Sequence, residues 1–397
     1  NSNGILFNKN AKVNTSGLVA TTKELSDADF QAGNYNFKGE SKASVINLGT
    51  IEVTNNSYVV LASNEVKNSG TIKAVKGKVY LSGASEYTIN LNGNSIVDLV
   101  VSKGVLDAMV ENSGTIIANG GEIYLTTNAV NELLKGVVNN SGVLEANSLD
   151  GLTGKVEVFA HGGTTNVSGT IEAKEGFVET SGKNLNITNS AKVTANKWLL
   201  DPTNITIESN GGSIGNESVS ATAIQNALST TNVELQADED ITVNENITWS
   251  TNKQLKLSAG DEIYVNAIIN NTNSTNGGVY FNAANMDDKV IFGTNGKVVI
   301  NNVYQLQWVD TALRGKYELG SDIDASVTST WNNGAGFDPL FNTYLYSDPN
   351  EPNMNYNMLA YFRGTFDGNN HTISNLYINR PDETNGIGLR SEERSVG

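Results

Sequence analysis

The sequence predicts an all-β protein that folds as a right-handed parallel β-helix, a solenoid in which each coil of the chain stacks on the previous one. Three observations support this fold class. A short phrase centred on Gly-Thr-Ile recurs through the first half of the 397 residues, and short strands of alternating apolar residues follow most copies. The composition combines 39 glycines with abundant asparagine, serine and threonine and only five prolines, which is typical of folded, turn-rich β-structure.

The recurring phrase is the main indication of a repeat. It reads NLGTIEV at 47–53, NSGTIKA at 68–74, NSGTIIA at 112–118, NSGVLEA at 140–146 and VSGTIEA at 167–173. The glycines of successive copies are 21, 44, 28 and 27 residues apart, and we interpret the interval of 44 as two periods with one degenerate copy. Such a period, with two or three strands in each, indicates a solenoid. An antiparallel sandwich or barrel would require turns every 8 to 12 residues, about half of this period, and no repeated phrases.

Four of the five copies carry an isoleucine at an equivalent place, and these side chains are predicted to stack along a common core: Ile51, Ile72, Ile116 and Ile171. The glycine and asparagine before them are expected at the corners, where a positive φ is required and a Cβ is costly. Coils about 4.8 Å apart would make a monomeric rod of 16 to 18 coils, on the order of 80 Å long.

Two stretches interrupt the repeat, and a third follows it. Residues 25–41 are aromatic and polar without a period, and predict an excursion from the coils. Residues 128–138 space apolar side chains as a helix does, with Asn128 as its cap, and Leu306, Val309 and Leu313 predict another short helix. With boundaries near 205 and 300, we expect segments at 1–205, 206–300 and 301–397.

Charge and composition exclude several classes of partner. The net charge of −16 disfavours nucleic acid and anionic membranes, because binding to either needs a basic face. No apolar run is long enough to span a bilayer. The chain has no cysteine, which excludes disulfides and thiolate metal sites. We expect no metal and no cofactor.

Catalytic residues are not apparent. His161 and His371 are too far apart in a solenoid to meet. The acidic groups at 238–240 and at 287–288 have the character of solvated turns. Neither combines alternating acids with a nearby arginine or lysine on a neighbouring repeat, and neither has a calcium-loop spacing. We therefore expect no enzyme. A β-helical polysaccharide lyase or hydrolase, which would use Asp238 or Asp240, and a passive structural solenoid stay open as alternatives.

Asn-x-Ser/Thr sequons are numerous, but an asparagine-rich chain contains about as many by chance. The candidate glycosylation positions are Asn14, Asn55, Asn139, Asn166, Asn186, Asn204, Asn216, Asn246, Asn270, Asn273 and Asn370.

Several stretches resemble a known family. The opening NSNGILFNKNAKVNTSGLVATT resembles the N-P-N-G-I motif of two-partner secretion exoproteins, the filamentous-haemagglutinin-like and high-molecular-weight adhesins, with Ser2 where the family often has proline. Residues 128–146 and KWLLDPTNITI at 197–207 are similar to further markers of the family. LRGKYELGSDIDAS, GAGFDPLF and FRGTFDGNNHTISNLYINRP resemble the GLUG-type motif of bacterial surface proteins, whereas the charged tail at 390–397 departs from it and has a non-native character.

The resemblance implies a secreted adhesin fragment. Its secretion domain (1–205), which we expect to be N-terminally truncated, would be recognised in the periplasm by the soluble domains of an outer-membrane transporter. The chain would then fold outside, at the cell surface or in the medium. The secretion motif maps onto Asn1, Ser2, Asn3, Gly4 and Ile5. A β-helix continuation (206–300) and a GLUG-like segment (301–397) would attach to a host receptor or glycan. Some relatives carry sugars on sequon asparagines.

Overall fold

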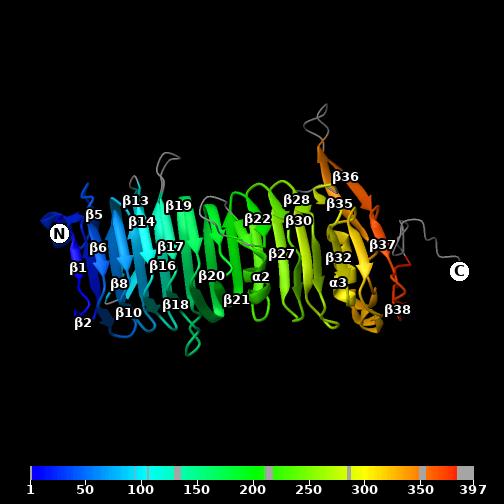
Figure 1. The fold of residues 1–397 in the computed structure, drawn as a ribbon, viewed down its shortest axis with the longest axis horizontal. Coiled ribbons are helices and arrows are strands. Elements are labelled where there is room, and N and C mark those ends of the chain that lie inside the picture. The colour runs from blue at the N-terminus through cyan, green and yellow to red at the C-terminus, as the bar shows by residue number, and fades with distance from the viewer. Residues whose placement is uncertain are drawn as a thin grey trace. The chain divides into compact units, whose positions relative to one another are not determined.

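The computed structural model describes residues 2–93, 95–104, 107–128, 136–209, 211, 218–283, 288–347 and 355–381. The chain divides into two compact units. Figure 1 labels the helices and strands of both units. Unit 1 comprises residues 1–204 and 210–232, and unit 2 comprises 205–209 and 233–397. Each is a stack of short strands that pair in parallel with the equivalent strands of neighbouring coils, which confirms the predicted parallel β-helix.

Every regular coil of unit 1 contains three strands, and each strand pairs with its counterpart one coil away. The first strands of the coils are β1 (Ile5–Phe7), β6 (Ser44–Asn47), β9 (Glu65–Asn68), β14 (Met109–Asn112) and β17 (Val137–Asn140). The second strands are β2 (Lys12–Thr15), β7 (Thr50–Val53), β10 (Thr71–Lys73), β15 (Thr115–Ile117) and β18 (Val143–Glu145). The third strands are β3 (Leu18–Thr21), β8 (Tyr58–Ser63), β11 (Lys78–Gly83) and β16 (Glu122–Asn128).

Longer strands continue the stacks by bending at the corners. They are β19 (Lys155–Val167), β20 (Thr170–Ile187) and β21 (Lys192–Pro202), followed by β23 (Ser218–Ser220) and helix α2 (Ala221–Ala227). Ser220 caps α2 with its side chain, which accepts from the Ala223 amide. The buried indole of Trp198, in the KWLLDP stretch, donates to the Thr180 hydroxyl at 2.9 Å. The sequence did not predict α2.

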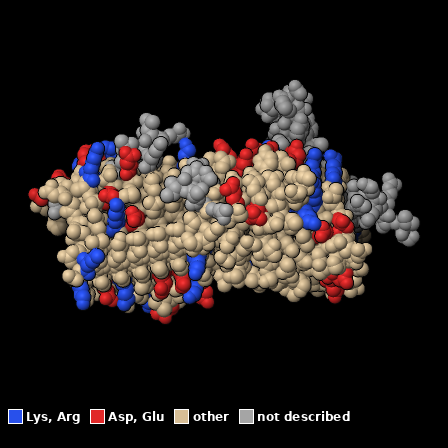
Figure 2. Space-filling model, in the orientation of Figure 1, with Lys and Arg blue, Asp and Glu red and all other residues tan. Residues whose placement is uncertain are grey.

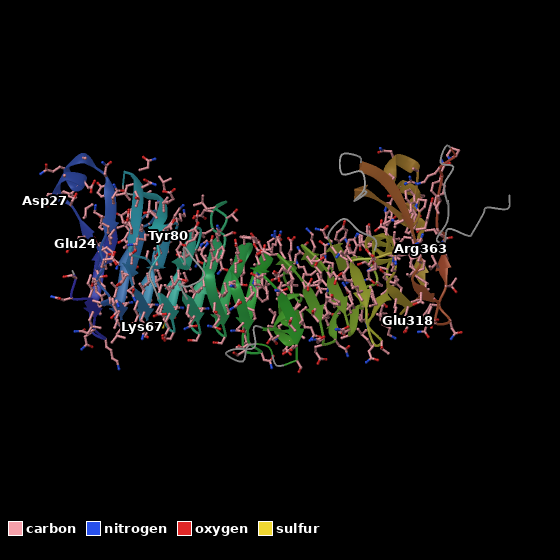
Figure 3. All side chains as sticks on the ribbon, turned by 90° about the horizontal axis from the view of Figure 1, so that it is seen from above. Glu24, Asp27, Lys67, Tyr80, Glu318 and Arg363 are labelled. Carbon is pink, nitrogen blue, oxygen red and sulfur yellow. The ribbon has the colours of Figure 1, made fainter. Side chains whose placement is uncertain are left out.

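The excursion predicted at 25–41 is confirmed, and it is joined by a second one. Strand β4 (Glu24–Leu25), helix α1 (Asp27–Ala32) and strand β5 (Tyr35–Lys38) leave the first coil, and β12 (Glu86–Asn92) and β13 (Ser95–Lys103) leave the third. Together the strands form an antiparallel sheet in the order β13-β12-β5-β4. Figure 3 shows Lys67 on the side of unit 1 opposite the excursion that carries Glu24 and Asp27.

Two predictions about the repeat were wrong. Thr71 pairs directly with Thr115 and Ile72 with Ile116, so the 44-residue interval is one coil enlarged by β12 and β13, not two periods. The short helix expected at 128–138 is absent at both ends of that range. Residue 128 is the last residue of β16, and residues 137–138 belong to β17. In-register pairing with adjacent coils outweighs helical spacing there. Residues 129–135 of that prediction lie outside the described part of the chain.

Unit 2 repeats the three-strand plan at shorter intervals. One stack consists of β22 (Ile205–Glu208), β25 (Ile241–Val243), β28 (Ile263–Val265) and β31 (Val290–Phe292). A second contains β24 (Asn232–Ala237), β27 (Gln254–Ala259) and β30 (Gly278–Ala283). The third contains β26 (Ile247–Trp249), β29 (Ile268–Asn271), β32 (Lys297–Ile300), β33 (Lys316–Leu319) and β37 (Thr365–Asp367).

The helix predicted from Leu306, Val309 and Leu313 is present as α3 (Val303–Gln307), continued by a 3₁₀ turn, η1 (Trp308–Thr311). Further along lie β34 (Ile323–Asp324) paired with β38 (Ile373–Ser374), the 3₁₀ turns η2 (Ser326–Thr330) and η3 (Asn332–Gly334), and the hairpin of β35 (Phe341–Ser347) and β36 (Asn355–Tyr361). Residues 390–397 lie outside the described chain.

The core of unit 2 changes from aliphatic to aromatic along the stacks. Leu235 pairs with Leu257, and Leu257 pairs with Phe281. Ring contacts then connect Phe281 to Phe292 and Phe292 to Tyr317, each with centroids 6.0 Å apart. Larger side chains fill the interior where the three-strand plan gives way to helices and a hairpin.

Candidate functional site

The predicted secretion motif forms a turn that leads into the first coil. Gly4 adopts φ +97°, a conformation that favours glycine. The Ser41 hydroxyl donates to the Ser2 carbonyl oxygen at 2.6 Å, and Ile5 pairs with Val45. The turn is therefore held against the loop that returns from the first excursion. Asn1 lies outside the described residues, and Asn3 takes part in an interaction of its own.

The four repeated isoleucines lie in one continuous stack. Ile51 pairs with Ile72 and Ile72 with Ile116; Leu144 then separates Ile116 from Ile171. All five side chains are fully buried. Burying such a side chain contributes about 1.5–3 kcal/mol, so this row is a main source of stability for the coils.

A row of asparagines runs beside the isoleucines, at the first position of the repeated phrase. Asn47 donates through Nδ2 to Oδ1 of Asn68, Asn68 to Asn112, and Asn112 to Asn140, each at 2.8 Å. We call these four residues the amide ladder. All are buried, and each side chain meets an identical group one coil away. The repetition of Asn47, Asn68, Asn112 and Asn140 thus reflects cooperative hydrogen bonding as well as corner geometry.

The corner glycines permit close approach of neighbouring coils. A Cβ on Gly70 would lie 2.1 Å from the carbonyl oxygen of Gly49, and one on Gly114 would lie 2.1 Å from that of Gly70. These positions accept no side chain unless the backbone moves. Glycine is therefore required here for space rather than for a positive φ.

The excursion sheet covers one outer face of the coils. Phe37 and Tyr87 stack at 5.1 Å and pack with Val60 and Tyr80, which point outward from β8 and β11. Burial raises the pKa of the Tyr87 phenol well above its usual range. Tyr80 also stacks on Tyr124 of the next coil at 4.6 Å. A second hydrophobic core therefore lies outside the solenoid, and it fixes the two excursions to unit 1.

Three of the candidate glycosylation asparagines belong to another row of hydrogen bonds in unit 1. Asn166 donates through Nδ2 to Oδ1 of Asn139, and Asn186 donates in the same way to Asn166, both at 2.7 Å. A sugar on Nδ2 of Asn166 or Asn186 would replace these bonds. Asn14, Asn55, Asn204, Asn246 and Asn370 are exposed, Asn270 and Asn273 are half-buried, and Asn216 lies outside the described chain.

The acids and histidines considered for catalysis are not brought together. Asp238 and Glu239 are exposed, and Asp240 accepts from the Glu262 amide at 3.0 Å. His161 stacks on Phe159, whereas His371 faces Asp322. Within the described ranges, no group of three or more histidine and carboxylate side chains is placed to bind a metal. Asp288 is exposed, and residue 287 lies outside the described chain.

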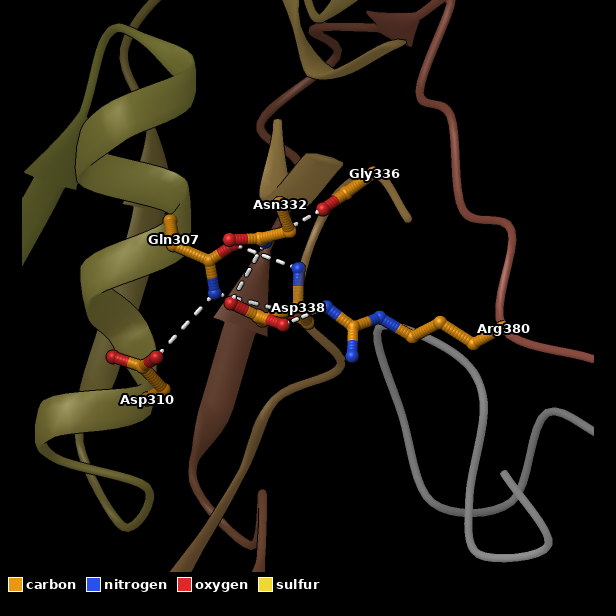
Figure 4. Close-up of polar contacts among 6 residues, drawn as sticks. All are labelled: Gln307, Asp310, Asn332, Gly336, Asp338 and Arg380. Atoms are coloured by element: carbon orange, nitrogen blue, oxygen red, sulfur yellow. Dashed lines mark hydrogen bonds and ion pairs between the residues drawn. The ribbon is translucent and has the colours of Figure 1, made fainter. Parts of the chain in front are cut away.

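Sequence reasoning missed a polar network in unit 2 (Figure 4). Gln307 donates to the Asp310 carboxylate at 3.3 Å and accepts from the Asp338 amide at 2.9 Å. Asn332 donates to the Asp338 carboxylate at 3.0 Å, and Arg380 forms an ion pair with the same group. Burial raises the pKa of Asp310 to about 6, although the Gln307 hydrogen bond acts in the opposite direction. Isolated polar residues in the sequence gave no signal for this arrangement.

Among the described residues, no helix is both long and apolar enough to cross a membrane. On the face that Figure 2 shows, acidic and basic side chains both occur along the upper and lower edges, and large areas between them are uncharged. The described part of the chain thus presents stacked coils, an outer face covered by the excursion sheet, and corner turns.

Residues 1–173 match the model of the TPS secretion domain family. This part of the chain is therefore a TPS secretion domain, the domain of two-partner secretion exoproteins, which pass through the periplasm to the cell surface or the medium. The expected family and localisation are confirmed.

Particular relatives extend the comparison. The chain is 31% identical over 235 residues to a heme/hemopexin-binding protein of Haemophilus influenzae, across 54% of this chain and 24% of that protein. It is 39% identical over 103 residues to Halomucin of Haloquadratum walsbyi, across 25% of this chain and 1% of Halomucin. The chain thus spans at most about a quarter of these curated relatives. The crystal structure of the HMW1 secretion domain from Haemophilus influenzae aligns with a TM-score of 0.48 and 20% identity, covering 74% of this chain and 76% of that one.

Proposed function

We propose that this chain is the export and attachment segment of a secreted bacterial adhesin. The match of residues 1–173 to the secretion domain is the observation that carries this proposal. The partner in export is a cognate outer-membrane transporter, whose soluble periplasmic domains recognise unit 1. Asn1, Ser2, Asn3, Gly4 and Ile5 form the recognition motif. The Ser41 hydroxyl, which donates to the Ser2 carbonyl oxygen, holds the described part of its turn in place.

Folding outside the cell favours outward movement. Each coil that forms buries one more side chain of the isoleucine stack and adds to the in-register pairing. The folded coils resist return through a pore that admits only an unfolded chain. The absence of cysteine fits this route, because no disulfide can trap the chain in the periplasm.

The test is expression of the chain, with a periplasmic targeting signal, in cells with and without a candidate transporter. We expect the protein in the medium only when the transporter is present. Asn3→Ala should reduce the secreted amount, and Lys73→Ala, which removes only an exposed ion pair with Glu52, should leave it unchanged. Equal secretion with and without every tested transporter would contradict the export role.

Attachment is assigned to unit 2, both to its first coils and to the GLUG-like segment at 301–397. The segments 316–324 and 364–374 lie in register as two neighbouring coils, with Lys316 opposite Thr365 and Ile323 opposite Ile373. The GLUG-like segment thus continues the solenoid. Binding of the purified chain to host cells, with residues 1–232, which contain all of unit 1, added as a competitor, tests whether unit 2 provides the attachment. Residues 1–232 should not compete.

Polysaccharide cleavage is the alternative that needs a separate test. Reducing-sugar and unsaturated-product assays over a glycan panel should give no activity. Activity that disappears in Asp238→Asn or Asp240→Asn would replace attachment by catalysis.

A further inference from the structure

A groove of about 710 Å³ opens on the surface of unit 2, at the corner between the β25-β28-β31 stack and the β26-β29-β32 stack. Five neighbouring coils contribute to its wall. The lining segments are 244–246, 266–268, 294–297, 316–318, and Thr365 with Asp367. Figure 3 shows Glu318, one of these residues, on the outer surface of unit 2. The groove therefore extends across the coils rather than into the core.

Two glycines make this corner concave. A Cβ on Gly296 would lie 1.7 Å from the Val265 carbonyl oxygen, and a Cβ on Gly293 would lie 2.4 Å from Oδ1 of Asn266. The turn Gly293–Gly296 can therefore lie flat against the coil beneath it. Any larger residue at Gly296 would push this turn outward and change the depth of the groove.

Several amide side chains of the lining are held in fixed positions. Asn266 donates through Nδ2 to Oδ1 of Asn244 at 2.9 Å, and Oδ1 of Asn246 accepts from the Ile268 amide at 2.8 Å. All three asparagines are nevertheless exposed, as is Asn295. A ligand would thus meet an ordered row of amide groups, which lowers the entropy cost of binding.

The charges of the lining nearly cancel. Lys297 forms an ion pair with Glu318, and Lys316 donates to the Gly293 carbonyl oxygen at 2.7 Å. Glu245 and Asp367 add two negative charges at the ends of the groove. A polyanion would therefore be repelled, while a neutral polar ligand would meet hydrogen-bonding groups of both kinds.

We propose that this groove binds a neutral glycan chain lying along the stacked coils, an inference that rests on the proposed attachment function. Sugar hydroxyls both donate and accept, as the asparagine amides do. The coils repeat about every 4.8 Å, a distance comparable to the length of one sugar ring, so successive rings can meet equivalent turns. An extended peptide fits less well, because Tyr317 is buried and the lining offers few apolar surfaces for side chains.

The test uses the full chain and a panel of neutral oligosaccharides of increasing length, with acidic oligosaccharides and unstructured peptides as competing classes. Binding is measured by saturation-transfer NMR and calorimetry. The variant Asn244→Ala/Asn295→Ala should weaken binding of a neutral oligosaccharide about tenfold or more, since each lost hydrogen bond is worth a factor of a few. Asn252→Ala, an exposed turn asparagine of unit 2 outside the groove, is the matched control.

Affinity should rise with chain length up to about the number of coils in the groove, and Asn252→Ala should bind as the unchanged chain does. Three results would overturn the proposal: no neutral glycan binds, peptides or acidic glycans bind better, or the groove variant binds as well as the control. If the groove variant still binds both host cells and the neutral oligosaccharide, the proposed attachment function is supported and the groove proposal is contradicted. Export is measured separately and does not depend on this result.

Discussion

Asn140 pairs directly with Val167 of the next coil, and the amide ladder ends at this contact. Because the side chain of valine has no hydrogen-bond acceptor, Nδ2 of Asn140 is buried without a hydrogen-bond partner among the described residues. The end of the ladder is also visible in the sequence, because the repeated phrase begins with asparagine in four copies and with valine in the fifth. Interior and terminal positions of the ladder should therefore differ in their contribution to stability.

Asn112→Val should destabilise the chain more than Asn140→Val. The first substitution leaves Nδ2 of Asn68 with only a long hydrogen bond of 3.4 Å to the Gly70 carbonyl oxygen, and it removes the ladder donor to Oδ1 of Asn140, at a cost of about 2–4 kcal/mol. The second removes one acceptor but also removes the unpaired Nδ2, so the loss should be about 1 kcal/mol. Urea unfolding followed by circular dichroism measures both. Equal losses would show that the ladder has no cooperative character.

Gly70→Ala should be strongly destabilising. The new methyl group would lie 2.1 Å from the Gly49 carbonyl oxygen, so two coils must separate or shift. We expect a loss of about 2–4 kcal/mol in the free energy of unfolding. Lys73→Ala, at an exposed position of the same coil, should cost less than about 1 kcal/mol and serves as the control. A wild-type stability for Gly70→Ala would refute the close-packing interpretation of the corner glycines.

Ile72→Asp combined with Ile116→Asp should reduce secretion sharply while leaving synthesis unchanged. Both side chains are fully buried in the stack, and a carboxylate there has no partner. The amount of protein in the medium and in the periplasm, measured by immunoblotting, distinguishes failed export from failed expression. Normal secretion of the double variant would show that coil stacking does not drive outward movement.

Asp310→Asn should flatten the dependence of stability on pH. The folded-state pKa of Asp310, about 6, lies above its ordinary value of 3.8, so the folded chain binds this proton more tightly than the unfolded chain does. The contribution is therefore fully present below pH 3.8 and is lost as the pH rises through 6. Since the side chain is half-buried, we expect a difference on the order of 1 kcal/mol between pH 4 and 7.

Thermal unfolding at several pH values measures this effect, and Asp288→Asn, at an exposed aspartate, provides the control. The unchanged chain and the control should lose stability in parallel over this range, whereas Asp310→Asn should lose less. If all three proteins lose stability in parallel as the pH rises, a group other than Asp310 causes the pH dependence.

The isoleucine positions and the first excursion could be predicted because each leaves a local signal. Ile51, Ile72 and Ile116 follow the same phrase, and residues 25–41 break it. The coil count between Gly70 and Gly114 could not be predicted in this way. The additional residues there form strands β12 and β13, and only their pairing with β5 shows that they belong to an inserted sheet.

The groove and the polar network could not be predicted from the sequence for a related reason. Asn244, Asn266 and Asn295 are ordinary turn residues individually, and they share one surface only because three coils stack in register. Gln307 and Asp338 meet across 31 residues without any repeated pattern. A feature that repeats along the chain can be predicted from the sequence, whereas a feature formed by segments of different sequence cannot.

The pairing of the two excursions also has a kinetic consequence. Ordinary coils join strands that are neighbours in the repeat, whereas the Thr88 hydroxyl reaches Asn36 across 52 residues. In a chain that folds from its N-terminus, the β5 edge stays open until β12 arrives, after three coils have formed. Since long-range pairing is slow compared with local pairing, this sheet is expected to set the pace of early folding. The later coils, which need only local pairing, should then add faster than this sheet forms.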